Sequence, residues 1–311
     1  MVLLVEKISK LYSKLENHHH QGHKHHQYSE TLSVSLQAFQ SEVSNCLNQL
    51  WLDSKPGSEI LSLPWIRQCL ALIPVINKAF AKLLVDIDFP VSDWEDSAVE
   101  EYLNYSLSLL GLFNSINSSL ACFEHVRLSL AHALSLVENS PSSAVVRLTA
   151  IQQRSPNKDF KKGETKEEGK GNIFSGKQWI THQALIVVKS IGFWVCGIVL
   201  SGLSSDGKPY LEMRKLVGGL IFSSFLELDS SICEIVMEKG TVLKEIKELN
   251  DTVTSLVATI VSGKHIEAAE ELQRELEVSE KLLEGLHKDV DRLFYEVIAG
   301  RNKLLNCLGH R

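Results

Sequence analysis

The feature that most constrains this chain is a run of twenty mostly apolar residues, Ala184–Leu203, with a single charged residue, Lys189. At a rise of 1.5 Å per residue, a helix of this length spans about 30 Å, which matches the hydrocarbon core of a bilayer. The run is therefore long enough either to cross a membrane or to form the buried central helix of a protein core. These two possibilities imply different architectures.

The composition of the run favours a protein core. Its eleven Leu, Ile, Val and Phe residues favour insertion by about 0.3–0.6 kcal/mol each, whereas a lysine at the centre of a span costs about 2.5–3.5 kcal/mol. Lys189 lies near one end and can extend toward the interface, but three glycines and two serines weaken insertion further. The sum is close to zero. We therefore expect a buried central helix, with a membrane span or re-entrant anchor as the alternative.

The 311-residue chain is long enough for a substantial core, and 44% of its residues are hydrophobic. Its formal net charge is −6, and it has no basic stripe interleaved with aromatic residues, so nucleic-acid binding is not expected. Six cysteines occur singly, without a C-x-x-C pair. This usage is typical of a reducing compartment and indicates neither a disulfide framework nor a zinc site.

Three helices are predicted before the apolar run. Apolar residues at steps of three and four predict the first helix over residues 30–52, and a second helix is predicted over residues 63–87. Pro74 removes a hydrogen bond inside the second helix, so we expect a break there. Ser92-Asp-Trp-Glu95 has the form of a capping box, which predicts that the third helix begins at Asp93.

The third helix is predicted to be long and to pack against the two helices before it. Its apolar residues keep a 4-3 spacing, broken only by Arg127, as far as Asn139-Ser-Pro. Three residues of the metal-ligating types, Cys122, His125 and His132, lie near this seam. Because no carboxylate or second cysteine stands at ligand spacing, we expect them to be structural.

A charged segment that contains glycine, residues 153–177, is predicted to be a linker between the two halves of the chain. At its end, Gly171–Gln178 has the spacing of a phosphate-binding P-loop. However, Gln178 occupies the position of the magnesium-binding Ser or Thr, and lysines and glutamates precede the motif in place of a buried strand. Nucleotide binding is therefore not expected.

Beyond the apolar run the chain is again predicted to be helical. Residues 204–209 indicate a turn, and residues 211–239 indicate one helix that is apolar on most sides. From about His265 a 4-3 repeat flanked by glutamates and lysines predicts a coiled-coil seam, which closes either on the protein's own helices or on a partner chain. The members of the seam are Leu272, Leu276, Leu283, Leu286, Val290, Leu293, Val297 and Leu304, with Ser279 and Gly300 in its two gaps.

The N-terminus combines a short amphipathic helix with a histidine-rich tract. The apolar residues of the helix are Leu4, Ile8, Leu11 and Leu15. We expect this helix to pack against the body of the protein, with adhesion to a membrane surface as the alternative. It lacks the basic start of a signal peptide. The histidines of the tract are His18, His19, His20, His23, His25 and His26. A polar tract lacks the fixed geometry of a metal site, so no native metal role is expected.

Together these features predict an all-α fold, an elongated antiparallel helical bundle with a coiled-coil-like C-terminal helix. Four parts are expected: a short helix with the histidine tract (1–29), an N-terminal helical region (30–152), the charged linker (153–177) and a C-terminal helical region (178–311) that packs on the N-terminal one. No nucleophile elbow, zinc-protease motif, glycine fingerprint or carboxylate pair occurs. The sequence therefore predicts no catalytic, cofactor-binding or metal-binding residue, no cofactor and no enzymatic activity.

Two motifs resemble the plant BYPASS family. The first is Leu61–Trp65, LSLPW, and the second is Phe89–Leu103, FPVSDWEDSAVEEYL. Members of that family share a leucine- and serine-rich opening that ends in tryptophan and, after a kinked helix, an acidic turn that starts a long helix. The likeness extends in general form from about residue 30 to the C-terminal coiled-coil-like region.

The resemblance implies a plant developmental regulator. Members of the family are associated with restraining a root-derived, carotenoid-related mobile signal that arrests shoot growth, and some relatives are linked to exocyst-type secretion partners. We therefore expect a helical interaction protein with a protein partner, located in the cytoplasm and in contact with an intracellular membrane or free of it. The family has no established catalytic residues, and none is carried over. The alternatives are a membrane-associated adaptor in exocyst-type secretion and a carrier or enzyme for an apolar metabolite. The oligomeric state is left open.

Overall fold

The structure, a computed structural model, describes residues 25–53, 60–152, 176–217, 223–239 and 242–309. Within these ranges the chain is helical and contains no strand, which confirms the all-α prediction. The elements are α2 (His25–Asp53), α3 (Leu63–Asp86), the 3-10 turn η1 (Val91–Asp93), α4 (Asp96–Ser135), α5 (Pro141–Gln152), α6 (Lys177–Ser204), α7 (Lys208–Arg214), α8 (Ser223–Glu234), the π-helical turn η2 (Ile235–Lys239), α9 (Lys244–Ser262) and α10 (Ile266–Gly309).

Some predictions fall outside the described ranges. These are the N-terminal amphipathic helix, the linker over residues 153–175 and the histidine tract as far as His23. His25 and His26 form the first turn of α2. The four-part division of the chain stays a prediction.

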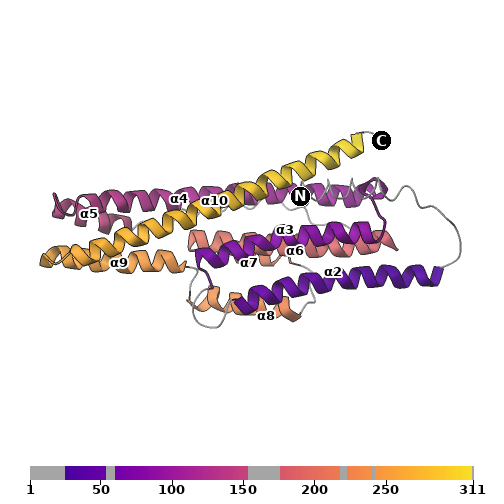
Figure 1. The fold of residues 1–311 in the computed structure, drawn as a ribbon, viewed down its shortest axis with the longest axis horizontal. Helices are drawn as coiled ribbons and strands as arrows, with labels where there is room; N and C mark the ends of the chain where they lie inside the picture. The colour runs from indigo at the N-terminus through magenta and orange to yellow at the C-terminus, as the bar shows by residue number, and fades with distance from the viewer. Residues whose placement is uncertain (1–24, 54–59, 153–175, 218–222, 240–241, 310–311) are drawn as a thin grey trace.

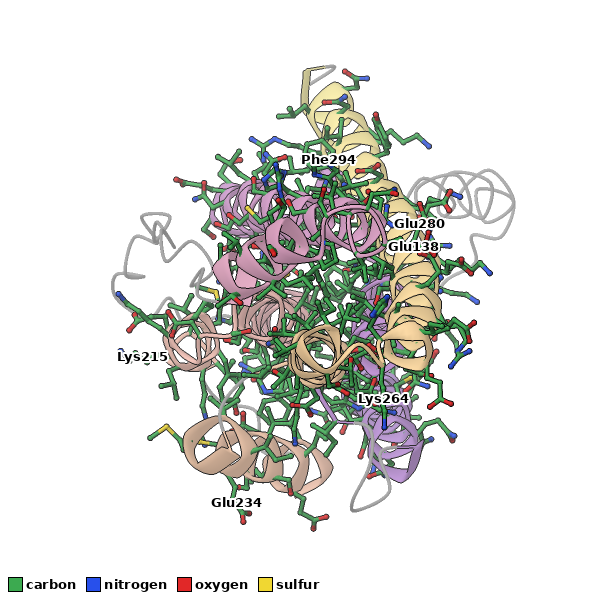
Figure 2. The ribbon with its side chains drawn as sticks, turned by 90° about the vertical axis from the view of Figure 1, so that its left-hand side faces the viewer. Glu138, Lys215, Glu234, Lys264, Glu280 and Phe294 are labelled. Carbon is green, nitrogen blue, oxygen red and sulfur yellow. The ribbon has the colours of Figure 1, made fainter. Side chains whose placement is uncertain are left out.

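The helices form an elongated bundle that confirms the predicted architecture (Figure 1). α6 is the central helix and packs against α2, α3, α4 and α7, whereas α10 crosses the bundle over α4, α9 and α3. Buried apolar residues from both halves of the chain join one hydrophobic core. Seen end-on in Figure 2, the charged side chains of Lys215 and Glu234 lie at the periphery of the bundle.

The apolar run of the sequence is the buried part of α6. All residues of Ala184–Leu203 are buried except Ile186 and Lys189, which are half-buried. Three of the described helices, α3, α4 and α6, are long and apolar enough to cross a membrane by length and composition, and the most apolar window of α6 is 89% buried inside the protein. The structure thus places the run where the core-helix prediction put it.

Two glycines of α6 show why this apolar helix contains small residues. A Cβ atom on Gly197 would lie 2.8 Å from the Cβ atom of Met213 on α7, and one on Gly202 would lie 2.9 Å from the Cδ1 atom of Ile66 on α3. Real Cβ atoms do not approach other heavy atoms so closely. These glycines weaken membrane insertion, but they allow neighbouring helices to pack close to α6.

The predicted coiled-coil seam is confirmed, and it closes on the protein's own helices. Its eight apolar residues, as well as Ser279 and Gly300, are buried. Near the C-terminal end of α10, the Arg301 guanidinium donates to the carbonyl oxygen of Leu103 at 2.5 Å and to the hydroxyl oxygen of Ser106 at 2.9 Å. Apolar packing and polar contacts therefore both hold α10 on α4.

The predicted break at Pro74 is wrong. α3 continues through Pro74 without interruption from Leu63 to Asp86. Its neighbours Ile73 and Ile76 are 3% and 2% exposed, and α3 packs on α6, α2 and α10. One lost backbone hydrogen bond does not end the helix, because its apolar face is buried on several sides.

The predicted capping box is also wrong. Ser92 belongs to η1, where its hydroxyl donates to the Asp93 carboxylate at 3.0 Å, and α4 begins at Asp96 with Glu95 as its N-cap and without a side-chain cap. The reason is Trp94, whose extended backbone carries its side chain into the core between Phe80 and Tyr102, with ring centroids 6.1 Å away in each case. This burial delays the helix by one turn.

Two further expectations need correction. α4 packs chiefly along α10 and α6, because the C-terminal half supplies the partners that the preceding helices were expected to supply. The single helix predicted over residues 211–239 is divided, since α7 ends at Arg214 and α8 begins at Ser223. α9 has no counterpart among the predicted helices.

The LSLPW motif forms the N-terminus of α3. Leu61 adopts a left-handed backbone with φ of 65°, and the Ser62 hydroxyl oxygen then accepts from the Trp65 amide at 3.3 Å. The carbonyl oxygen of Leu61 accepts from the Lys244 amide, and the Glu245 carboxylate accepts from the Leu63 amide at 2.9 Å. The motif therefore caps α3 and attaches the start of α9 to it.

We predict opposite results for two serines that look alike in the sequence. Ser62→Ala removes the cap of α3 and is expected to lower the free energy of unfolding by about 0.5–2 kcal/mol. Ser92→Ala removes only an exposed hydroxyl contact and is expected to change it by less than about 0.5 kcal/mol. Urea unfolding of both variants measures the difference, and equal losses would contradict the assignment of the caps.

Glu245 gives a prediction about pH. Burial raises the pKa of its carboxyl group above the usual value, although the Leu63 amide opposes this shift, and its Oε2 atom is buried without a partner. A carboxyl group with a raised folded-state pKa favours folding below its unfolded-state pKa, and this contribution is lost as pH rises through the folded-state pKa. Glu245→Gln, which stays neutral, is therefore expected to gain stability relative to the unmodified protein as pH rises from 4 to 7. Urea unfolding at both values tests this, and a difference that does not change with pH would contradict it.

Candidate functional site

The buried carboxylate of Asp229 organises the junction of α6, α7 and α8. Asp229 is 5% exposed, and its carboxylate accepts from the Trp194 indole nitrogen at 2.9 Å, the Tyr210 hydroxyl at 2.5 Å and the Arg214 Nε atom at 2.7 Å. One donor comes from α6 and two come from α7. A buried charge is tolerated only when it is paired and hydrogen-bonded in this way.

The electrostatics of this cluster suit a structural clamp. Burial, together with the hydrogen bond to Asp229, raises the pKa of Tyr210 well above its usual value, so the phenol stays protonated and keeps donating. The hydrogen bond to Asp229 also raises the pKa of Arg214. Neither group can give up a proton near neutral pH. The cluster therefore fixes α8 against α6 and α7 and is not an acid–base pair.

The buried cysteines are also unsuited to catalysis. Burial raises the pKa of Cys196 to about 12 and that of Cys69 well above its usual value. A thiol in this state is not a nucleophile at neutral pH, because the thiolate is the reactive form. Both cysteines act as small apolar residues of the core.

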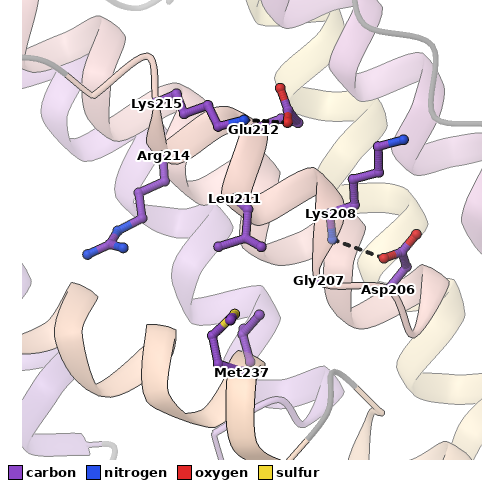
Figure 3. Close-up of a pocket in the computed structure, with 9 residues that line it drawn as sticks. Asp206, Gly207, Lys208, Leu211, Glu212, Arg214, Lys215 and Met237 are labelled. Carbon is purple, nitrogen blue, oxygen red and sulfur yellow. Dashed lines mark hydrogen bonds and ion pairs between the residues drawn. The ribbon is translucent and has the colours of Figure 1, made fainter.

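A groove of about 780 Å³ lies beside the Asp229 cluster (Figure 3). Its apolar part consists of Leu211, Val236 and Met237, and Met237 is 66% exposed. Its polar part holds cationic side chains that are partly neutralised, since Lys215 pairs with Glu212 at 2.7 Å. The remaining lining residues are Asp206, Gly207, Lys208 and Arg214.

The groove is the candidate functional site in the described part of the chain. It offers an apolar floor beside cationic groups, and its lining residues include no histidine, cysteine or serine to act as a nucleophile or general base. Arg214 is common to the groove and the Asp229 cluster, so the clamp also sets the position of one groove cation. Such a surface can bind an apolar anion or a protein segment, but it provides no chemistry of its own.

The metal-ligating residue types in the third helix do not come together. Cys122, His125 and His132 are exposed on the outer face of α4 and are not part of its buried seam, which corrects their predicted position. No group of three or more His, Cys, Asp and Glu residues able to hold a metal ion is found in the described ranges. Of the P-loop-like stretch, Gly176, Lys177 and Gln178 are described, and the Lys177 ammonium donates to the carbonyl oxygen of Asp88 at 2.5 Å.

Sequence analysis missed Asp229 and its partners. The available signal was the position of an acidic residue on the apolar face of α8, between the buried residues Phe225, Leu228 and Ile232. An acidic residue on an apolar face indicates that its carboxylate has a buried partner. The sequence does not identify that partner, because Trp194 lies 35 residues away in the chain.

Comparison with known proteins assigns the chain to a family. A family model described as Protein BPS1 matches residues 91–307, which begin at η1 and extend through α10. The chain belongs to the BPS1 family. This match confirms the resemblance to the plant BYPASS family, and it includes most of the second motif of that resemblance.

Comparison with individual proteins shows how far the likeness extends. The chain is 26% identical over 308 residues to "Protein BPS1, chloroplastic" of Arabidopsis thaliana, which covers 90% of this chain and 85% of that protein. It is 24% identical over 245 residues to "UPF0496 protein 4" of Oryza sativa subsp. japonica, and this alignment covers 72% of this chain and 50% of the rice protein. The chain thus spans about half the length of the rice relative. No solved structure matches the chain.

Proposed function

We propose that this protein is a non-catalytic regulator of plant development that restrains a root-derived mobile signal that arrests shoot growth. The observation that carries the proposal is the BPS1 family match over residues 91–307. The described groove and the Asp229 cluster support it, because they offer a binding surface and a clamp without an activated nucleophile. The protein acts through a protein partner that binds its helical surfaces.

Complementation tests this function. The chain is expressed in an Arabidopsis thaliana line that lacks its own Protein BPS1, either only in roots or only in shoots. Because the signal is proposed to start in the root, expression in the root is expected to restore shoot growth, and expression only in the shoot is not. Grafts of mutant shoots onto expressing roots provide the matched control. Failure of root expression to restore growth, with the protein present, would overturn the proposal.

A second candidate function is a carrier for an apolar metabolite. The groove favours it, because Leu211, Val236 and Met237 form an apolar surface next to cationic side chains. Purified protein would bind an apolar carboxylate, and Met237→Asp would abolish the binding. An adaptor in exocyst-type secretion would differ from such a carrier in what it binds. Co-precipitation with this protein would then recover secretion proteins, and the purified protein would bind no apolar metabolite.

We further propose a cytoplasmic location in contact with an intracellular membrane. The long apolar helix α4 supports membrane contact, because only 33% of its most apolar window is buried inside the protein. The Arabidopsis relative is named chloroplastic, so a chloroplast location is the outcome against which the proposal is tested. A fluorescent protein fused to the C-terminus, observed together with a chloroplast marker, distinguishes the two.

A further inference from the structure

An exposed apolar patch lies where the C-terminal part of α10 runs beside the first half of α4. Leu107 on α4 is 58% exposed, and Tyr295 and Leu305 on α10 are 69% and 43% exposed. Further apolar side chains around them are half-buried. These are Leu103, Leu110, Phe294 and Ile298. We call this set of residues the α4–α10 patch.

Two polar contacts hold the helices side by side at the patch. The Asn117 side-chain amide donates to the Asp291 carboxylate at 3.0 Å, and the Arg301 guanidinium donates to the hydroxyl oxygen of Ser106 at 2.9 Å. α10 therefore runs antiparallel to α4, and most of the patch lies between these two contacts. Figure 2 shows Phe294 at the outer edge of the bundle, where α10 lies beside α4. The patch is thus a single surface formed by two helices.

α10 carries more large apolar residues here than its buried seam requires. The seam residues Leu293, Val297 and Leu304 are each followed directly by another one. Adjacent residues of a helix point about 100° apart, so the additional side chains form a second stripe beside the seam. Its members are Phe294, Ile298 and Leu305. A contiguous apolar surface that the core does not fully bury indicates contact with something outside the molecule.

The part of α4 beside the patch is uncharged. No charged residue occurs between Glu101 and Glu124, which is a stretch of about 33 Å. The hydroxyls of Ser108, Ser115 and Ser118 donate to carbonyl oxygens of α4 itself, at 3.0–3.1 Å. Because these polar groups are already satisfied, covering this face costs little desolvation.

The part of α10 next to the patch has a positive charge. Residues 292–309 contain three basic residues and one acidic residue, Glu296, so this stretch has a formal charge of +2, whereas that of the whole chain is −6. The basic residues are Arg292, Arg301 and Lys303. The Arg292 side chain is 60% exposed, although it lies 3.4 Å from the Asp289 carboxylate. An apolar surface with a basic edge is complementary to a membrane leaflet that contains anionic lipids.

The size of the patch argues against a second copy of the chain as its partner. Residues 294–305 of α10 span about 18 Å, and two packed helices present a surface about 20 Å wide, so the patch has an area of about 360 Å². A stable dimer buries about 800 Å² on each partner. Binding to a lipid surface has no such threshold, because its strength increases gradually with the apolar area that is buried.

We infer that the α4–α10 patch is the face through which this protein contacts an anionic membrane surface. The inference rests on the proposed membrane contact and assigns that contact to named residues. α4 and α10 lie along the membrane, Leu107 and Leu305 enter the boundary between headgroups and acyl chains, and the Tyr295 ring lies at the level of the headgroups. α6 stays in the protein core. Because only three side chains of the patch are largely exposed, we expect weak and reversible binding, no stronger than the about 10⁴ M⁻¹ of a single myristoyl chain.

Co-sedimentation of the full chain with vesicles tests this face. The vesicles contain phosphatidylcholine and phosphatidylserine in equal amounts. Leu107→Glu changes an exposed leucine of the patch, and the matched control, Leu226→Glu, makes the same change at a leucine that is 51% exposed on α8. We expect Leu107→Glu to weaken binding by at least about tenfold and Leu226→Glu to leave it unchanged. Binding of the unmodified protein to vesicles of phosphatidylcholine alone is expected to be weaker, and equal binding would overturn the role of the basic edge.

Quenching by brominated lipids locates the contact independently. Tyr295→Trp places an indole in the patch, and Leu226→Trp places one on α8 as the control. Both variants keep the five tryptophans of the chain as a common background. Lipids brominated on their acyl chains are expected to quench the added indole at position 295 but not the one at position 226.

The outcomes separate this inference from the membrane contact on which it rests. Failure of the unmodified protein to bind the vesicles would overturn both. Binding that Leu107→Glu and Leu226→Glu leave equally strong would assign the membrane contact to another face and overturn the inference alone. A dimer in light scattering that Leu107→Glu dissociates would overturn it in favour of a second copy.

Discussion

Asp229→Ala is expected to lower the free energy of unfolding by about 3–5 kcal/mol. The substitution removes the acceptor of the Trp194 indole, the Tyr210 hydroxyl and the Arg214 guanidinium at once. Trp194 is fully buried, so its N–H group has no access to replacement water. An unsatisfied buried donor costs about 1–3 kcal/mol, and the loss of the ion pair with Arg214, whose side chain is 41% exposed, adds a smaller amount. Urea unfolding followed by tryptophan fluorescence measures the change.

Asp229→Asn is the matched control for this prediction. The amide oxygen can still accept from Trp194 or Tyr210, so the variant loses the charge but keeps an acceptor. Its destabilisation is expected to be clearly smaller than that of the alanine variant. The damage should also be local, with faster hydrogen exchange in α8 and η2 than in α10. A loss below about 1 kcal/mol for Asp229→Ala would show that the cluster does not hold α8.

The local periodicity of the sequence was sufficient for the long helices. The apolar positions of α10 repeat at helical spacing and are buried as predicted, because a stripe of apolar side chains has to face a core. The core position of Ala184–Leu203 also followed from its composition, since its glycines and its lysine oppose a span. These features depend on residues close together in the chain.

The predictions that were wrong concern features that depend on residues far apart in the chain. The start of α4 is set by Trp94, whose burial between Phe80 and Tyr102 overrides the capping pattern of Ser92 and Glu95. Pro74 is tolerated because neighbouring helices hold α3. A single sequence reports local preference but not the partner that prevails over it.

The candidate site was hidden for the same reason. The residues of the Asp229 cluster lie on three helices and form no motif, and the groove beside it is lined by ordinary surface residue types. The absence of catalytic motifs could be read from the sequence. The clamp could not, because it exists only once α6, α7 and α8 are packed together.

The half-buried lysine of α6 gives the last prediction. The Lys189 ammonium lies 2.7 Å from the Glu101 carboxylate, and their side chains are 19% and 12% exposed. The other carboxylate oxygen of Glu101 lies 3.2 Å from the Nδ1 atom of His182. This ion pair joins α6 to α4, which belongs to the N-terminal half of the chain. This ion pair explains how a lysine is accommodated in the most apolar of the described helices.

Lys189→Leu is therefore expected to destabilise the bundle by about 3–5 kcal/mol, because Glu101 is left in the core without its ammonium partner. Replacing both residues, Glu101→Leu with Lys189→Leu, should cost less than Lys189→Leu alone, since no uncompensated charge remains. A membrane-spanning α6 predicts the reverse, because removing the lysine would lower the insertion cost by up to about 3 kcal/mol and strengthen membrane retention. Carbonate extraction of membranes that contain the unmodified protein decides between the two. We expect release into the supernatant, and retention in the pellet would show that α6 lies in lipid and that the Glu101–Lys189 pair does not hold it in a protein core.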